Sequence, residues 1–169
     1  MIHPEHPFLP AEGDRDLVRR FRGRLASPVT IVTAGTGAGR AGLTVSSLFV
    51  VEGEPALIYA QVGLLTDLWE AVGATGRFVV HVCANRQQPP ADVFAGLRPS
   101  PGGMFAGVEH RDTEWGPALA GLPDRAFCRL RQADEVGYSG VVVGEVERIE
   151  VSDLTDPLVH FRGGYRRLA

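Results

Sequence analysis

The sequence predicts a mainly β fold, a small β-barrel with flanking helices, and three observations lead to this class. Six or seven segments are apolar and rich in β-branched residues, as strands are. Short turns containing glycine or proline separate most of them, which favours antiparallel neighbours and a barrel. Only a few short segments have the apolar spacing or the capping residues of a helix. The 169 residues, 44% of them apolar, suffice for one core that needs no metal or disulfide.

The predicted elements form a meander that one long loop interrupts. We expect a Pro-rich N-terminal arm over residues 1–13 and a single domain over residues 14–169. Helices are predicted over residues 14–25, over residues 66–72 with Thr66 or Asp67 as the cap, and briefly over residues 91–97. Strands are predicted over residues 29–34, 43–53, 56–62, 77–84, 125–134 and 137–151, with a last short strand near the C-terminus. The loop is predicted over residues 85–115, a length that is usually functional or mobile.

Charge and cysteine content exclude several classes of partner. The formal net charge of −3 argues against nucleic acid or an anionic membrane as the main partner, because both require a basic face. No export signal and no membrane-spanning apolar run is present, so we expect a cytoplasmic protein. Cys83 and Cys128 lie far apart in apolar segments without metal-ligand spacing, which predicts two reduced core thiols and no metal site.

A glycine-rich stretch matches the residue pattern of a nucleotide-binding motif but lacks the structural context that such a site needs. Residues 37–42 fit G-x-G-x-x-G and follow a predicted strand. A dinucleotide site needs a helix directly after this motif, with its N-terminus facing the pyrophosphate. The residues that follow, LTVSSLFVV, have strand character instead. The stretch is therefore predicted to be a hairpin loop.

The segment after this loop carries three hydroxyls within four residues. Strand alternation places Thr44 and Ser46 on one face and Ser47 on the other. Two interpretations stay open from these residues alone. The hydroxyls form a polar outer face or edge strand, or they line a slot for a planar heteroaromatic ligand.

No side-chain constellation of a known hydrolase or metalloenzyme is present in the sequence. Among the histidines, His81 lies within a predicted strand and His160 beside C-terminal aromatic residues, and each lone histidine is typically structural or solvated. If the protein is an enzyme, a bound cofactor is therefore expected to supply the chemistry.

Basic residues form two clusters. The arginines between residues 15 and 24 are expected to be the solvated face of the first helix. Arg162, Arg166 and Arg167 are interleaved with Phe161 and Tyr165. This second cluster is suited either to a phosphate or an aromatic ring, or to a subunit interface, and the sequence favours neither.

Taken together, these features resemble the flavin reductase-like family, the FMN-binding split barrels, over residues 21–168. The resemblance is carried, in chain order, by SPVTIVTA, GLTVSSLF, PALIYAQV, TDLWEAVGATGRFVVHV, GEVERIEV and PLVHFRGGYRRL. It implies a six-stranded antiparallel Greek-key split barrel. It also implies a homodimer that holds flavin at the dimer interface.

The resemblance also implies which residues contact the flavin. The edge of the isoalloxazine ring would be contacted by Thr44, Val45, Ser46 and Ser47, and the ribityl and phosphate groups by Gln61, Leu65, Thr66 and Asp67. The ring would be approached from another side by Cys83, Ala84 and Asn85, and the pocket would be capped by Phe161 and Tyr165.

The chain departs from the family pattern at three places. Many members carry Ser-x-Thr in the phosphate turn, whereas residues 63–66 keep only the threonine. His81 stands where the family often has asparagine. Where the family often has Gly-Asp-His, this chain has Gly137, Tyr138 and Ser139. Tyr138 and Ser139 are therefore the expected catalytic positions, with Tyr138 either stacking on the nicotinamide or filling its place.

The implied activity is that of an NAD(P)H-dependent flavin reductase. FMN or FAD would receive a hydride from NADH or NADPH as co-substrate, and the reduced flavin would serve a flavin-dependent monooxygenase. The alternative is a non-catalytic binding module for flavin, haem or deazaflavin.

Overall fold

The computed structural model describes residues 12–169, with side chains from Leu17 onward, so most of the predicted arm lies outside the described residues. Three α-helices and two short 3-10 helices are present in this part of the chain: α1 Glu12–Arg22, α2 Asp67–Thr75, α3 Gln88–Phe94, η1 Gly37–Gly39 and η2 Asn85–Gln87. The strands of the first half are β1 Ser27–Pro28, β2 Thr30–Ala34, β3 Ala41–Val45, β4 Leu48–Val51, β5 Leu57–Val62 and β6 Arg77–Val82. Those of the second half are β7 His110–Thr113, β8 Gly116–Leu119, β9 Arg125–Val136, β10 Ser139–Glu150, β11 Val159–Phe161 and β12 Gly164–Arg166.

One antiparallel sheet forms the body of the molecule. Its strand order is β3-β2-β6-β9-β10-β5-β4, so consecutive strands β3 and β4 occupy its two opposite edges. Two residues, Ser46 and Ser47, connect these edges, which requires the sheet to curl round on itself. Counting β3 and β4 as one bent segment, the sheet has the six members of the split barrel that the sequence resemblance implied. The predicted single strand over residues 43–53 is wrong in this respect, because the chain leaves one edge and joins the other at the serines.

The hairpin between β2 and β3 confirms the hairpin predicted at residues 37–42, although Ala41 and Gly42 already belong to β3. The two strands pair antiparallel from Thr30 opposite Val45 to Ala34 opposite Ala41, and η1 fills the connection. No helix follows the glycines, so this motif has no phosphate-binding geometry.

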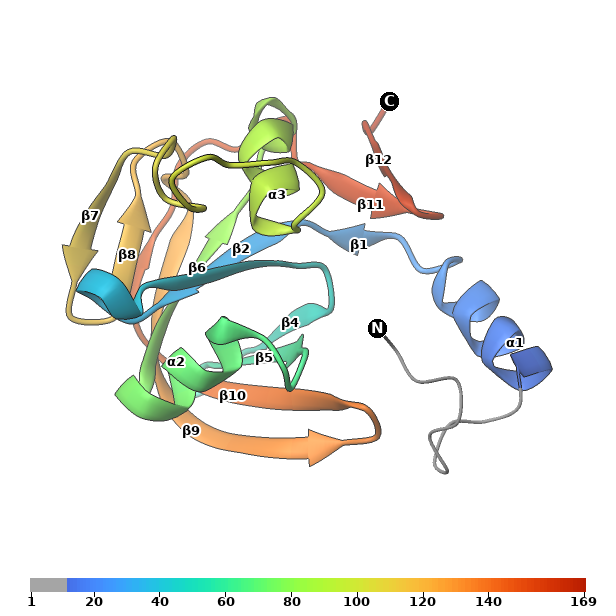
Figure 1. Ribbon diagram of the computed structural model, residues 1–169, viewed down its shortest axis with the longest axis horizontal. Coiled ribbons are helices and arrows are strands. Elements are labelled where there is room, and N and C mark those ends of the chain that lie inside the picture. The colour runs from blue at the N-terminus through green and yellow to red at the C-terminus, as the bar shows by residue number, and fades with distance from the viewer. Residues whose placement is uncertain (1–11) are drawn as a thin grey trace.

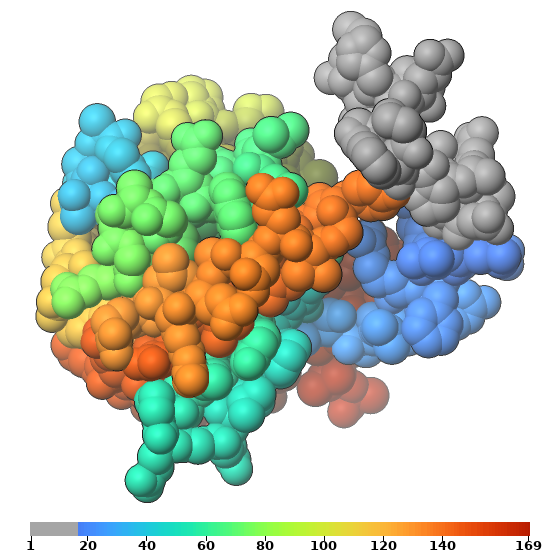
Figure 2. Space-filling model, turned by 90° about the horizontal axis from the view of Figure 1, so that it is seen from below, coloured from blue at the N-terminus to red at the C-terminus, as the bar shows by residue number. Residues whose placement is uncertain are grey.

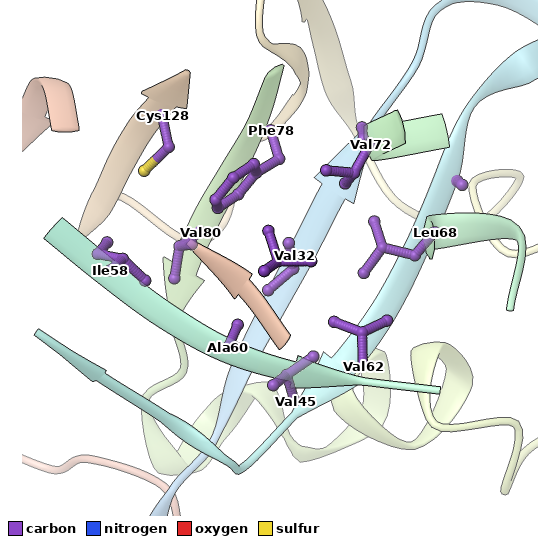
Figure 3. Close-up of a cluster of buried hydrophobic side chains, with 13 residues drawn as sticks. Val32, Val45, Ile58, Ala60, Val62, Leu68, Val72, Phe78, Val80 and Cys128 are labelled. Carbon is purple, nitrogen blue, oxygen red and sulfur yellow. The ribbon is translucent and has the colours of Figure 1, made fainter. Parts of the chain in front are cut away.

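The barrel interior is an apolar core that α2 closes at one end. Thirteen buried residues from the strands and α2 form this cluster, and Figure 3 shows them converging from several strands. The Thr66 hydroxyl accepts a hydrogen bond from the Trp69 N–H, which confirms Thr66 as the N-cap of α2. The helix continues through Gly73 to Thr75, three residues beyond the predicted end, and Gly76 caps it in the left-handed conformation.

A second core lies outside the barrel, beneath α3. It contains Val29, Ile31, Cys83, Ala91, Phe94, Leu119, Leu122 and Leu158. The residues predicted as one long loop therefore hold η2, α3 and β7. α3 begins at Gln88, three residues before its predicted start, because Pro89 and Pro90 occupy its first turn, where a missing N–H costs nothing. Both cysteines are free and buried, and burial raises the pKa of each thiol to about 12.

A strand near the start of the described chain pairs with one near its end. Ser27 and Pro28 form β1, which pairs with β11 opposite His160 and Val159, and β11 pairs with β12. The first helix ends at Arg22, three residues before its predicted end. In Figure 1, α2 and α3 pack against the curled sheet, whereas α1 lies to one side of the sheet and does not pack against it.

Candidate functional site

The Ser46–Ser47 connection, which closes the barrel, is also where three adjoining cavities meet. Ser46 lines all three of them, with volumes of about 640, 640 and 330 Å³. Such volumes are typical of sites for cofactors and nucleotides. The sheet curvature that brings β3 and β4 together thus places two hydroxyls at the centre of a composite groove.

The first cavity, called the arginine groove below, is basic. It lies between the last turn of α1 and the turn that joins β11 to β12. Five arginines line it, Arg19, Arg20, Arg22, Arg24 and Arg162, together with His160. Both serines face it from the barrel side.

The second cavity is mostly apolar and lies along β4 and β5. The rings of Phe49 and Tyr59 on its wall are stacked, with centroids 4.9 Å apart and planes inclined by 3°. Gln61 lines the same cavity, and its backbone N–H donates to the Ser47 carbonyl at 2.9 Å. The Gln61 side-chain amide donates to the Ser139 hydroxyl at 2.9 Å. This bond ties the β9–β10 hairpin to the groove.

The third cavity lies between β3, α3 and the C-terminal hairpin, and several polar side chains line it. Thr44, Asp92, His160 and Tyr165 line it together with Ser46. Burial, followed by the neighbouring Asp92 carboxylate, raises the pKa of Tyr165 to about 12, so this phenol stays protonated at neutral pH.

The Thr44 hydroxyl is already used within the fold. It donates to the Ala91 carbonyl at 2.6 Å, which fastens β3 to α3. Thr44 and Ser46 share one cavity wall that excludes Ser47, as strand alternation predicted. Val45 between them is buried in the barrel core. Of the three predicted hydroxyls, the two serines are therefore better placed than Thr44 to meet a ligand.

Three residues predicted to contact the ribityl and phosphate groups lie outside the three cavities. Leu65, Thr66 and Asp67 form the turn before α2 and its first residue, and none of them lines the three cavities. Leu65 is 100% exposed. The Thr66 hydroxyl donates to the Gly63 carbonyl at 2.7 Å while it caps α2.

The segment from Cys83 to Asn85 is held by backbone contacts outside the composite groove. Cys83 exchanges backbone hydrogen bonds with Val29 and Leu158. The Ala84 N–H donates to the Gln87 side chain, and the Asn85 N–H donates to the Asp156 carbonyl.

The remaining predicted residues lie at two turns. Tyr138 is 53% exposed at the tip of the β9–β10 hairpin, next to Ser139. Phe161 lies beneath the Arg162 guanidinium, which is 5.4 Å from the centre of its ring. Thr44, Ser46, Ser47, Gln61 and Tyr165 are thus brought together at the cavities, with Ser139 bonded to Gln61.

His81 serves the fold. Its ring is fully buried, with Nδ1 3.0 Å from the Ile31 carbonyl and Nε2 accepting from the Leu119 N–H at 3.0 Å. Burial lowers its pKa to about 3, so the ring is neutral and Nδ1 carries the proton. The structural role expected of a lone histidine is confirmed at this position.

Sequence reasoning missed several residues that line the site. Asp92 lies within the predicted loop, and Phe49 and Tyr59 are ordinary strand residues, so no pattern distinguished them. The arginines in the last turn of α1 are exposed, as expected of a solvated helix face, but their place in the lining of the first cavity was not predicted. The high density of arginines near the end of a predicted helix was the sequence signal that could have indicated an anion-binding surface.

The composite groove fits a flavin nucleotide. A planar ring needs apolar surface and hydrogen-bond donors along one edge, and the Phe49–Tyr59 wall and the two serines supply these. A phosphate needs cations, which the arginine groove supplies. Within residues 12–169, no group of three or more potential ligand side chains is placed to hold a metal ion. No helix in that range is long and apolar enough to span a membrane.

Comparison with known proteins gives the family. The family described as "Flavin reductase like domain" matches residues 22–169. The reductase component of 4-hydroxyphenylacetate 3-monooxygenase from Thermus thermophilus is 33% identical over 145 residues, covering 86% of this chain and 91% of that relative. The FMN reductase (NADH) RutF of Variovorax paradoxus is 28% identical over 151 residues, covering 89% of this chain and 84% of that relative.

A solved structure agrees with these relatives. The NADH:FAD oxidoreductase SgcE6 of Streptomyces globisporus superposes with a TM-score of 0.83 at 27% identity, covering 99% of both chains. A further structure of the same oxidoreductase contains NAD and FAD fragments. From the match over residues 22–169 and from these relatives, the chain belongs to the flavin reductase-like family.

Proposed function

We propose that this protein is an NADH-dependent flavin reductase that supplies reduced flavin to a flavin-dependent monooxygenase in the cytoplasm. The observation that carries the proposal is the meeting of three cavities at Ser46, two of which Ser47 also lines. Relatives named for FMN reduction, for FAD reduction and as a monooxygenase reductase component support it.

The chain's own residues position the reactants and exclude water. When bound, the flavin accepts a hydride from the nicotinamide. The hydroxyls of Ser46 and Ser47 are donors at the barrel-closing connection, where they orient a planar ring and stabilise negative charge that grows on it. The stacked rings of Phe49 and Tyr59 cover apolar surface along β4 and β5. Holding two planar reactants together supplies much of the rate enhancement, since no side chain here needs to act as a nucleophile.

Gln61 and Ser139 have positioning roles in this proposal. Their hydrogen bond joins the hairpin that carries Tyr138 to the wall of the second cavity. Tyr138 is exposed at that hairpin, where its ring is free to stack on a nicotinamide. The contacts inferred by resemblance for Val45, Leu65, Thr66, Asp67, Cys83, Ala84, Asn85 and Phe161 stay predictions.

The proposed assembly is a homodimer. Leu17, Val18 and Phe21 of α1 are 61%, 69% and 68% exposed, an apolar helix face that no described part of the same chain covers. The edge strand β4 exposes Phe49 and Val50 as well, at 59% and 57%. Apolar helix faces and apolar sheet edges are both unfavourable in water, so a second copy that covers them explains both.

Anaerobic reduction tests the activity. Purified protein is mixed with FMN or FAD and then with NADH or NADPH in the absence of oxygen, and the visible flavin absorbance is followed. Catalytic bleaching is the expected result, faster with NADH. Flavin binding without bleaching by either nicotinamide would instead indicate a binding module, and failure to bind either flavin would refute both functions.

The same preparation tests the assembly. Light scattering gives the molar mass in solution, and Phe21→Glu is expected to shift it towards that of one chain. Gln132→Glu, on the exposed part of β9, is the matched control for added charge. A native chain with the mass of a monomer would contradict the dimer.

A further inference from the structure

Cations gather in one groove of an otherwise acidic protein. The chain has 17 basic residues and a net charge of −3. Five of these residues, Arg19, Arg20, Arg22, Arg24 and Arg162, line the arginine groove. Among the side chains that the structure describes, no aspartate or glutamate lines it. In Figure 2 the blue segment that carries α1 stands beside the barrel, with the red C-terminal segment below it.

The groove is formed by two elements that are far apart in the sequence. The last turn of α1 provides Arg19, Arg20 and Arg22, the segment directly after the helix provides Arg24, and the β11–β12 turn provides the fifth arginine. The pairing of Ser27 with His160 brings these elements together. The clustering is therefore a product of the tertiary structure as well as of a basic run in the sequence.

Arg162 adds an independent observation. Its φ of +49° makes it the one non-glycine residue of the described chain in the left-handed region. That region favours glycine or asparagine, and side chains held there against their preference cluster at ligand sites. An arginine at this turn position adds its charge to the lining of the groove despite the backbone preference.

The turn that the family resemblance assigns to phosphate has no such charge. Gly63, Leu64 and Leu65 offer no cation, the Thr66 hydroxyl is used in capping α2, and Asp67 is acidic. Only the N-terminus of α2 would favour an anion there. Arginine, by contrast, binds phosphate oxygens with paired, charge-assisted hydrogen bonds.

We propose that the arginine groove binds the phosphate or diphosphate group of the nucleotide whose ring lies against Ser46 and Ser47. This inference rests on the proposed reductase function and names the recognition element of that same site. The ligand class is a phosphate ester, from a flavin nucleotide or from the nicotinamide dinucleotide. The arginine groove would then select phosphorylated forms over the bare ring systems.

Substrate series with and without phosphate test this proposal. Steady-state KM is measured for riboflavin, FMN and FAD at fixed NADH, and for NADH against N-benzyl dihydronicotinamide at fixed flavin. The test variants are Arg20→Gln with Arg24→Gln, and Arg162→Asn, which suits the left-handed turn. The control is Arg98→Gln with Arg131→Gln, which removes two exposed arginines outside the arginine groove.

The expected result is a KM about tenfold higher for the phosphorylated member of one series, with the KM of its phosphate-free partner unchanged. A change in the flavin series identifies flavin phosphate as the ligand, and a change in the nicotinamide series identifies the dinucleotide. Added salt should raise the same KM in the native protein and less so in the variants, because it screens these charges.

Two results have different meanings. If the native protein reduces riboflavin and FMN with equal KM, and the variants match the control in both series, the phosphate site is refuted while the reductase function stands. If the native protein reduces no flavin with either nicotinamide, the proposed function itself fails. Thermal unfolding of each variant shows that a raised KM is not caused by loss of folded protein.

Discussion

The side-chain amide of Gln61 donates to the Ser139 hydroxyl at 2.9 Å, while the Gln61 backbone N–H donates to the Ser47 carbonyl at 2.9 Å. One residue thereby links the barrel-closing serines to the hairpin that carries Tyr138. The side-chain bond extends the pairing of β5 with β10 beyond Val62 and Gly140, the last pair of the backbone ladder at this end.

Loss of this link should affect the nicotinamide more than the fold. Ser139→Ala is expected to lower kcat/KM for NADH about three- to tenfold, the equivalent of one hydrogen bond of about 0.5–1.5 kcal/mol. The free energy of unfolding should change by less than about 1 kcal/mol, since the bond is exposed. Ser100→Ala, which removes a serine bond to the Gly103 carbonyl, is the control for stopped-flow kinetics. Equal kinetics in the two variants would contradict a positioning role.

Thr44 and Ser46 should respond differently to loss of the hydroxyl. Thr44→Val removes the bond to Ala91, so we expect a loss of about 1 kcal/mol in stability and little change in flavin affinity. Ser46→Ala should weaken flavin binding about tenfold and leave the unfolding transition nearly unchanged. Fluorescence titration with FMN and chemical denaturation measure the two effects. The opposite pattern would place the ligand against Thr44 instead.

His81 should make stability depend on pH. The pKa of His81 is about 3 in the folded protein and 6.5 ordinarily. Between these two pH values the unfolded chain therefore binds a proton at His81 that the folded protein does not bind. Stability is therefore full above pH 6.5 and falls as the pH drops towards 3, by about 2 kcal/mol at pH 5. Urea unfolding between pH 5 and 7.5 measures this slope. His81→Asn has no titrating group there, and an equal slope in that variant would refute the assignment.

Two glycines near α2 should give opposite results. A Cβ at Gly140 would lie 2.2 Å from the Trp69 ring, so Gly140→Ala should destabilise the protein by about 1–3 kcal/mol. Gly73 lies within α2 with open space at its Cβ position, so Gly73→Ala should stabilise by about 0.5–1 kcal/mol. Denaturation midpoints compare them. Equal and small effects would mean that Trp69 does not pack on Gly140.

Most elements could be predicted because their signals are local. The β-branched runs of β2, β5 and β6, the Thr66 cap and the glycine-rich hairpin depend on residues adjacent in sequence. The helix α3 was predicted three residues too late at both ends, because its start depends on the tolerance of a first turn for Pro89 and Pro90.

The site was predictable only where its residues lie on one segment. Ser46 and Ser47 were found because three hydroxyls in an apolar strand are unusual. Asp92 was not found, because a single carboxylate in a loop carries no pattern, and only the packing of α3 against the C-terminal hairpin brings it to Tyr165.

The sequence by itself determined the β class and the family and singled out Ser46 and Ser47 as candidates, since propensity, capping and motif order are properties of the chain. The tertiary structure decided that these serines join opposite edges of one curled sheet, and that arginines from α1 and Arg162 meet beside them. The physical reason is that strand order and the approach of distant turns depend on how the whole core is buried, which no local pattern specifies.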